Sequence, residues 1–154
     1  MNVASIQIRD AQPDEVTELE QLQWRASLVW EEYREDLEAH PDEIEVSSRD
    51  IAAGNVRVAE GDGGVLGFFV LCDRAGDAAE LDGLFVEPDA MRRGIGRSLI
   101  ADAVALARSR GCARVEVTAN PRAVDFYVKT GFVDDGVVQT RFGPGLRMHL
   151  AVER

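Results

Sequence analysis

The sequence has few of the residues that build disulfide or metal centres. It contains 2 cysteines and 2 histidines in 154 residues. Cys72 and Cys112 are too few and too far apart for a disulfide framework or a zinc site, and nothing like HExxH or CxxC surrounds His40 or His149. We therefore expect a reduced protein without a structural metal.

Long apolar runs and a basic leader are also absent from the sequence. No stretch approaches the ~18 apolar residues of a membrane helix. The longest apolar run, from Gly63 to Cys72, has the length of a strand. Residues 1–10 lack the basic start and apolar core of a secretory signal. These absences predict a soluble, cytoplasmic protein that makes no contact with a membrane.

Positive charge is scarce as well. The chain has 17 Lys and Arg against 28 Asp and Glu, a net charge of −11. Binding to nucleic acid needs clustered bases over the docking face, so this acidity argues against a nucleic-acid partner. The charge is uneven, because residues 1–50 hold 14 acids and 4 bases, whereas residues 92–122 hold 7 bases and 2 acids. The chain could attract cations at one place and anions at another, or simply expose two solvated faces.

The length and the hydrophobic pattern predict a single folded domain over residues 1–154. With 45% hydrophobic and 29% charged residues, the chain can bury a core of ordinary size. Apolar segments of strand type fall at residues 5–9, 57–60, 65–73, 80–86, 114–118, 132–140 and 146–152. Helical spacing and capping residues predict helices from Pro13, over 26–39, over 95–107 and from Asn120. The order β-α-α-β-β-β-α-β-α-β-β indicates an α/β sheet, with loops at residues 41–49 and at Gly143-Pro144-Gly145.

The clearest chemical motif is a glycine-bearing turn between a strand and a helix. The strand ending at Pro88 runs into Met91-Arg92-Arg93-Gly94-Ile95-Gly96-Arg97-Ser98. The N–H groups at a helix start are unpaired and suit a pyrophosphate, which glycine allows to approach closely. The GK[ST] of a P-loop and the third glycine of a Rossmann loop are both absent. A tight turn that binds no ligand is the alternative.

Three motifs together resemble the GCN5-related N-acetyltransferase (GNAT) superfamily. They are Leu81-x-x-Leu84-x-Val86-x-Pro88, then Met91-Arg92-Arg93-Gly94-Ile95-Gly96, which resembles [QR]xxGxG, and Asn120-x-x-Ala123-x-x-Phe126-Tyr127-x-x-x-Gly131-Phe132. Met91 stands where the family usually has Gln or Arg. The resemblance implies a mixed, mostly antiparallel central sheet flanked by helices, with splayed fourth and fifth strands. It also implies acetyl-CoA-dependent N-acetyltransferase activity.

The resemblance implies that acetyl-CoA lies where strands 80–86 and 114–118 separate. Backbone groups of Leu84, Phe85 and Val86 would pair with the pantetheine arm. One N–H there would hold the acetyl carbonyl and stabilise the oxygen that becomes negative. The pyrophosphate would be held by the turn and the helix start, at Arg92, Arg93, Gly94, Ile95, Gly96, Arg97 and Ser98.

The third motif and the strand before the turn supply candidate catalytic residues. Asn120 is expected beside the pantetheine or the sugar phosphate, and Phe126 beside the cofactor or in the core. Tyr127 is the candidate general acid for the leaving thiolate. The alternative is that Tyr127 only packs on the sheet, with its hydroxyl at the rim.

A base must also remove a proton from the amine. Glu80 occupies the position of a catalytic glutamate in some relatives, and Asp82, two residues further on, is expected to project from the same face of the strand. Glu116 is a third choice, and a chain of water molecules is the alternative to all three. No well-placed cysteine or serine nucleophile is visible, so we expect direct attack in a ternary complex.

The acceptor side is the least defined part of the prediction. In the resembled family the acidic helical region lines the acceptor pocket, so Trp30, Glu31 and Tyr33 are candidates for binding a cationic amine. Core packing is the alternative for these aromatic residues. The acceptor is expected to be a small-molecule amine or a peptide amine, and a homodimer is a family-level expectation. A non-catalytic acyl-CoA sensor and a protein-interaction subunit are the other functions that the sequence allows.

Overall fold

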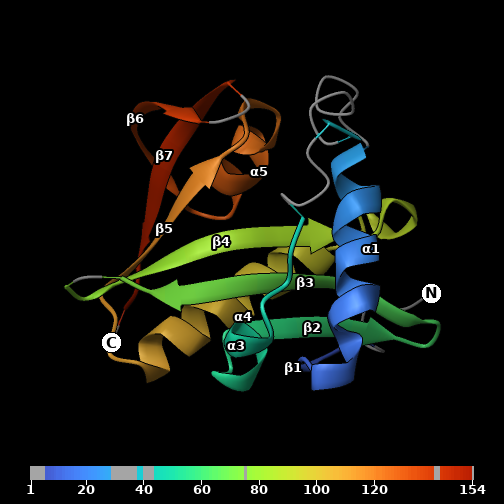
Figure 1. Ribbon diagram of the computed structural model, residues 1–154. Coiled ribbons are helices and arrows are strands. Elements are labelled where there is room, and N and C mark those ends of the chain that lie inside the picture. The colour runs from blue at the N-terminus through green and yellow to red at the C-terminus, as the bar shows by residue number, and fades with distance from the viewer. Residues whose placement is uncertain (1–5, 29–37, 40–43, 75, 141–142, 154) are drawn as a thin grey trace. The chain divides into compact units, whose positions relative to one another are not determined.

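The computed structural model describes residues 6–28, 38–39, 44–74, 76–140 and 143–153 of the chain (Figure 1). Seven strands form one sheet in the order β1-β2-β3-β4-β5-β7-β6. Strands β4 and β5 run parallel, whereas β1–β2, β2–β3, β5–β7 and β6–β7 are antiparallel. The mixed, mostly antiparallel sheet expected from the sequence is thereby confirmed. The strands are β1 (Gln7–Asp10), β2 (Val56–Gly61), β3 (Gly64–Asp73), β4 (Ala78–Val86), β5 (Arg114–Ala119), β6 (Val133–Thr140) and β7 (Gly143–Ala151).

The helices agree with the sequence pattern except at one short segment. They are α1 (Val16–Leu28), α3 (Ser48–Ala52), α4 (Ile95–Ser109) and α5 (Val124–Lys129), with 3-10 turns at Pro13–Glu15, Pro88–Ala90 and Pro121–Ala123. The second predicted helix, over 26–39, falls largely outside the described residues. The loop predicted over 41–49 is wrong at its end, because α3 begins at Ser48. Ser47 caps this helix by accepting hydrogen bonds from two backbone N–H groups, and Ile51 is buried beneath it.

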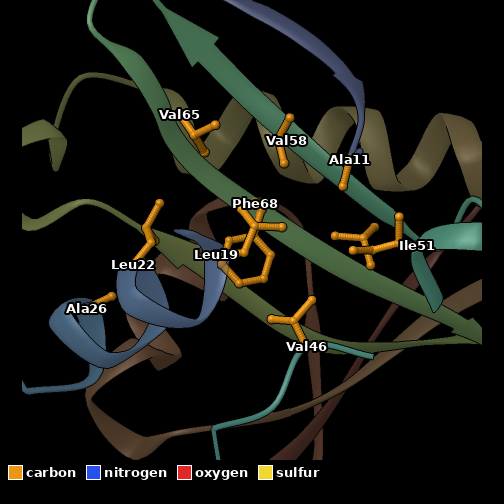
Figure 2. Packing of buried hydrophobic residues seen from close by; sticks show 10 residues of the cluster. Ala11, Leu19, Leu22, Ala26, Val46, Ile51, Val58, Val65 and Phe68 are labelled. Atoms are coloured by element: carbon orange, nitrogen blue, oxygen red, sulfur yellow. The ribbon is translucent and has the colours of Figure 1, made fainter. Parts of the chain in front are cut away.

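The chain forms two compact units. One comprises residues 1–70 and 83–99, and the other comprises residues 71–82 and 100–154. In the first unit, α1 packs on one face of β2 and β3 (Figure 2). Leu19, Leu22 and Ala26 follow one another at helical spacing and are buried against Val58 and Phe68. Removal of these side chains from water is the main force that holds α1 on the sheet.

The second unit is built on β5, β7 and β6. Met148 of β7 is completely buried, and Val115 and Val117 of β5 are nearly so. Strand β6 stands at the end of the strand order. Its residues Val133 and Val137 are 56% and 69% exposed. A register shift between Asp134 and Gly136 marks a bulge in this strand.

The predicted link at Gly143-Pro144-Gly145 is wrong, because all three residues belong to β7. Their pairing with β6 continues to Thr140 opposite Gly143. Glycine and proline indicate a turn when the chain is considered locally. The pairing with β6 overrides that preference, and Pro144 is tolerated near the start of the strand.

The pairing between β4 and β5 is short. It extends over four residue pairs, from Ala78 opposite Arg114 to Leu81 opposite Val117. Strand β4 then continues to Val86, and β5 continues to Ala119. The two strands therefore stop pairing part of the way along β4, as the predicted splay requires.

No helix within the described ranges is both long enough and apolar enough to cross a membrane. The longest, α4, has 15 residues.

Candidate functional site

The predicted anion-binding turn is an exposed loop of the first unit. It joins the 3-10 turn Pro88–Ala90 to α4, which begins at Ile95. Arg92 and Gly94 have left-handed backbone, with φ of 66° and 81°. Arg92 is the only non-glycine residue with positive φ in the described part of the chain. A Cβ added at Gly94 would have no heavy atom within 4 Å, so the space above this glycine is open.

The start of α4 presents backbone N–H groups beside this open space. The N–H of Ser98 donates to the carbonyl oxygen of Gly94 at 3.0 Å. The three preceding N–H groups lack an acceptor within the helix, because they belong to its first turn. Ile95 is buried and fixes the helix end, whereas the side chains of Arg92, Arg93 and Arg97 are exposed. The backbone N–H groups of the first turn and the three guanidinium groups therefore lie at the same exposed part of the chain. This arrangement suits a diphosphate.

The end of β4 lies in the same unit as this loop. The ring of Phe85 packs on Phe68 with 5.3 Å between ring centroids. Phe85 is half-buried, and its side chain packs against the core of the first unit. Leu84 and Val86 are half-buried.

Tyr127 lies on α5 in the second unit, enclosed by aromatic rings. Phe126 and Phe132 each make an edge-to-face contact with it, with centroids 5.2 Å away. Tyr127 is only 8% exposed, and this burial raises the pKa of its phenol to about 12. The hydroxyl is protonated throughout the neutral range, and the raised pKa makes it a weaker acid than an exposed phenol.

Glu80 is the only buried charged residue in the described part of the chain. Nη1 of Arg147 donates to its Oε2 at 2.8 Å, and Nη2 of Arg147 donates to its Oε1 at 3.2 Å. Nε of Arg74 donates to Oε1 at 3.1 Å. The hydrogen bonds to Glu80 raise the pKa of Arg147 above its ordinary value. The proposed base is thus held by two guanidinium groups.

The sequence did not predict the two arginines around Glu80. The alternation of Leu146, Met148 and Leu150 with Arg147 and His149 was a signal that the two polar side chains share one face of β7. It could not show which strand lies opposite, because sheet register depends on contacts between distant parts of the chain.

The structure also describes the predicted residues Asp82 and Asn120, but not the predicted acceptor residues. Asp82 is exposed, two residues beyond Glu80. Asn120 caps the turn before α5, because its side-chain oxygen accepts from the N–H of Arg122 at 2.9 Å, and this confirms the predicted cap. Trp30, Glu31 and Tyr33 lie outside the described residues.

His149 contacts a carboxylate, and Cys112 is a buried thiol. Nδ1 of His149 lies 2.7 Å from Oδ2 of Asp135, across β7 and β6. Burial and, to a smaller extent, Asp73 raise the pKa of the Cys112 thiol. A thiol of this kind is a poor nucleophile, because only the thiolate attacks. No cluster of three or more possible metal ligands occurs within the described ranges.

The sequence matches the model of the Acetyltransferase (GNAT) family over residues 14–132. Glucosamine 6-phosphate N-acetyltransferase 1 of Oryza sativa subsp. japonica is 31% identical over 96 residues, which cover 62% of this chain and 56% of that protein. An uncharacterized N-acetyltransferase of Methanocaldococcus jannaschii is 37% identical over 81 residues, which cover 46% of this chain and 36% of that protein. The chain thus spans about half, or less, of the length of these curated relatives.

Solved structures share the fold over nearly the whole chain. Ard1 from Thermoplasma volcanium superposes with a TM-score of 0.75 at 18% identity, covering 97% of this chain and 99% of that one. PaiA N-acetyltransferase from Thermoplasma acidophilum, solved in complex with coenzyme A, gives a TM-score of 0.71 at 21% identity, covering 96% and 99%. At these identities the similarity shows the fold alone.

Proposed function

This chain belongs to the GNAT acetyltransferase family, and we propose that it transfers an acetyl group from acetyl-CoA to a primary amine. The observation that carries the proposal is the open, left-handed turn from Arg92 to Gly94 at the start of α4. Arg92 is strained by its left-handed backbone, and the turn leads directly into the first turn of α4, whose N–H groups lack partners within the helix. Exposed guanidinium groups at the same place fit the charge of a diphosphate.

The proposed cofactor contacts follow from the first unit. Acetyl-CoA supplies the acetyl group as a thioester. The backbone of Leu84, Phe85 and Val86 binds the pantetheine arm, and one of its N–H groups polarises the acetyl carbonyl. The diphosphate is bound by the turn and the helix start, at Arg92, Arg93, Gly94, Ile95, Gly96, Arg97 and Ser98. We also propose cofactor contacts at Asn120 and Phe126, which the third motif of the family supplies.

Two proton transfers complete the proposed mechanism. The amine must lose a proton before its lone pair can attack, and Glu80 accepts that proton, with Asp82 as the competing choice. Tyr127 donates its phenolic proton to the departing sulfur. The edge-to-face contacts of the Tyr127 ring with Phe126 and Phe132 hold the phenol in one orientation, which a proton donor requires. Much of the rate comes from holding both substrates together, which lowers the entropic barrier.

The proposed acceptor is a small cationic amine or a peptide amine. The relative from Oryza sativa is named for glucosamine 6-phosphate, an amino sugar. The 14 acids among residues 1–50 favour a positively charged acceptor. Trp30, Glu31 and Tyr33 are the residues that we assign to it.

Thiol release from acetyl-CoA tests the proposal. Purified protein is incubated with acetyl-CoA and glucosamine 6-phosphate, spermidine or an alanyl peptide, and a reaction without amine measures background hydrolysis. We expect amine-dependent release of coenzyme A with at least one of the three. Tight binding of coenzyme A without turnover would favour an acyl-CoA sensor, and failure to bind coenzyme A would favour a protein-interaction subunit.

A matched pair of glycine variants tests the turn itself. Gly94 and Gly76 have nearly equal φ, 81° and 82°, and neither has a heavy atom within 4 Å of an added Cβ. Gly94→Ala and Gly76→Ala therefore introduce the same backbone strain. Calorimetric titration with coenzyme A is expected to show affinity lost by about tenfold or more for Gly94→Ala only. Equal affinity in the two variants contradicts the assignment of the turn.

A further inference from the structure

The charged cluster around Glu80 supports an inference that deepens the proposed function and rests on it. We propose that Arg147 is a positioning residue, which holds the Glu80 carboxylate so that Oε2 takes the proton of the amine. Arg147 lies on β7, outside the three motifs that led to the proposed function.

Sheet register brings this arginine to Glu80. Strand β5 lies between β4 and β7 in the strand order. The β4–β5 ladder sets Glu80 opposite Glu116, and the β5–β7 ladder sets Thr118 opposite Arg147. The long side chain of Arg147 reaches across β5 to the carboxylate on β4, at 2.8 Å. The contact is therefore fixed by the pairing of three neighbouring strands, and Glu80, Thr118 and Arg147 all belong to the second unit.

The two carboxylate oxygens of Glu80 differ in the hydrogen bonds that they accept. Each oxygen of a carboxylate has two lone-pair positions, about four in all. Nε and Nη2 of Arg74 both lie 3.1 Å from Oε1, which also accepts from Nη2 of Arg147 at 3.2 Å, so both of its positions are used. Oε2 accepts from Nη1 of Arg147 at 2.8 Å. One position on Oε2 is left over, and it is the place where a proton can be received.

Arg147 is itself held in place. Its Nη1 also donates to Oγ1 of Thr118 at 2.9 Å, and its Nη2 lies 3.5 Å from Oε1 of Glu116. Hydrogen bonds to both oxygens of one carboxylate fix the direction of both groups, which contacts with one oxygen do not. Arg74 contacts Oε1 only, through Nε and Nη2, and its side chain is 53% exposed, against 23% for Arg147. Loss of Arg147 thus frees the carboxylate to turn about the contact with Arg74.

A double-mutant cycle on the steady-state rate tests this role. The variants are Arg147→Gln, Glu80→Gln and the double variant, assayed with acetyl-CoA and whichever of glucosamine 6-phosphate, spermidine and the alanyl peptide reacts fastest. Arg147→Lys is the conservative variant, because an ammonium keeps the charge but lacks the fork. Arg114→Gln is the matched control, since Arg114 pairs with Glu116 and its side chain is 52% exposed.

We expect Glu80→Gln to lower kcat by about 100-fold and Arg147→Gln by about tenfold or more. Because Arg147 acts through Glu80, the double variant is no slower than Glu80→Gln, within about twofold. The KM for acetyl-CoA stays within about twofold throughout, and Arg147→Lys recovers part of the lost rate. Arg114→Gln keeps the rate of the native protein. Circular dichroism and thermal melting establish that each variant is folded.

The outcomes separate the two proposals. If Glu80→Gln is slow but Arg147→Gln keeps the native rate, Arg147 does not position the base. The same conclusion follows if the double variant shows the product of the two single losses, because the residues then act independently. If Glu80→Gln itself keeps the native rate, the base assigned under the proposed function is wrong, and the role of Arg147 is overturned with it.

Discussion

Arg25 of α1 and Glu87, the residue that follows β4, form an ion pair with two hydrogen bonds. Nε of Arg25 donates to Oε1 of Glu87 at 2.9 Å, and Nη2 donates to Oε2. The Glu87 carboxylate raises the pKa of Arg25 above its ordinary value. The N–H of Glu87 donates to the carbonyl oxygen of Leu66 at 2.8 Å. Because Glu87 directly precedes Pro88, the pair connects α1 to the beginning of the turn that is proposed to bind the diphosphate.

Replacement of Arg25 by alanine is expected to raise the KM for acetyl-CoA by about two- to fivefold with little change in kcat, because ground-state binding is weakened. The free energy of unfolding falls by at most about 1 kcal/mol, since the pair is partly exposed and screened by solvent. Steady-state kinetics and urea unfolding measure the two effects. Arg57→Ala, which breaks the Arg57–Asp10 pair of the same unit, is the control. Equal KM values for the two variants would contradict a role for the Arg25 pair.

Gly67 of β3 lies against the backbone of β4. A Cβ added there would come within 2.8 Å of the carbonyl oxygen of Phe85 and 3.2 Å of a methyl group of Leu99. We expect Gly67→Ala to lower the free energy of unfolding by about 1–3 kcal/mol, because backbone atoms cannot give way as a flexible side chain can. Gly63→Ala is the control, since its Cβ meets nothing within 4 Å. Urea unfolding that shows equal losses in both variants would refute the close approach.

The left-handed backbone of Arg92 predicts a stabilising substitution. An L-residue in this region is strained by about 1–2 kcal/mol, whereas glycine is not, although glycine gains more freedom in the unfolded chain. Arg92→Gly is therefore expected to raise the free energy of unfolding by about 0.5–1 kcal/mol. Arg92→Ala removes the same charge and keeps the strain, so it should show no gain. Urea midpoints of the two variants measure the difference, and a gain of equal size in both would assign the effect to charge.

Tyr127→Phe tests the proposed general acid. The variant keeps the ring contacts with Phe126 and Phe132 and loses only the hydroxyl. We expect kcat to fall by about 100-fold while the KM for acetyl-CoA changes little, because a positioned proton donor acts in the transition state. The rate is measured over a range of pH. A rate that equals that of the native protein at every pH shows that Tyr127 does not donate the proton.

The same phenol predicts how stability depends on alkaline pH. In the unfolded chain a tyrosine ionises near its ordinary pKa of 10, whereas burial holds the pKa of Tyr127 at about 12 in the folded protein. Its contribution to stability is complete below pH 10 and is lost as the pH rises toward 12. The loss is about 2–3 kcal/mol, because one unit of pKa difference is worth about 1.4 kcal/mol. Urea unfolding between pH 9 and 12 should show an excess loss in the native protein relative to Tyr127→Phe. Parallel curves for the two proteins would contradict the burial of the phenol.

Local pattern was sufficient to predict several elements near the site. Ile95, Leu99, Ala103 and Ala107 are spaced along one stripe, and all four are buried on α4. Asn120 stands before a proline, and the structure shows it as the cap of the turn that leads into α5. In both cases the relevant contacts lie within a few residues of one another. Helical period and capping chemistry therefore carry the information.

Features that depend on distant strands were not predictable. The hydrogen bonds between Arg147 and Glu80 join residues that are 67 positions apart. This contact requires the parallel pairing of β4 with β5 and the register of β7 on β5. Neither can be predicted from the residues close in sequence to Glu80 or Arg147. The start of β7 at Gly143 was missed for the same reason, since the partner strand decides where pairing begins. For the same reason, the order and register of the strands in an α/β protein are harder to predict from the sequence than its helices.

Strand β6 is an edge strand of the sheet, and an edge is where a second copy of the chain can add a strand. A bare sheet rim rich in valine is a template on which another molecule can add a strand and start a fibril. Here Asp134 and Asp135 sit at the bulge, and the N–H of Gly136 is turned toward the Asp134 side chain at 2.7 Å instead of outward along a regular edge. A second strand laid along this rim meets a kink and two carboxylates. We therefore expect Asp134, Asp135 and Gly136, which have no part in the proposed chemistry, to disfavour the addition of a strand at this edge.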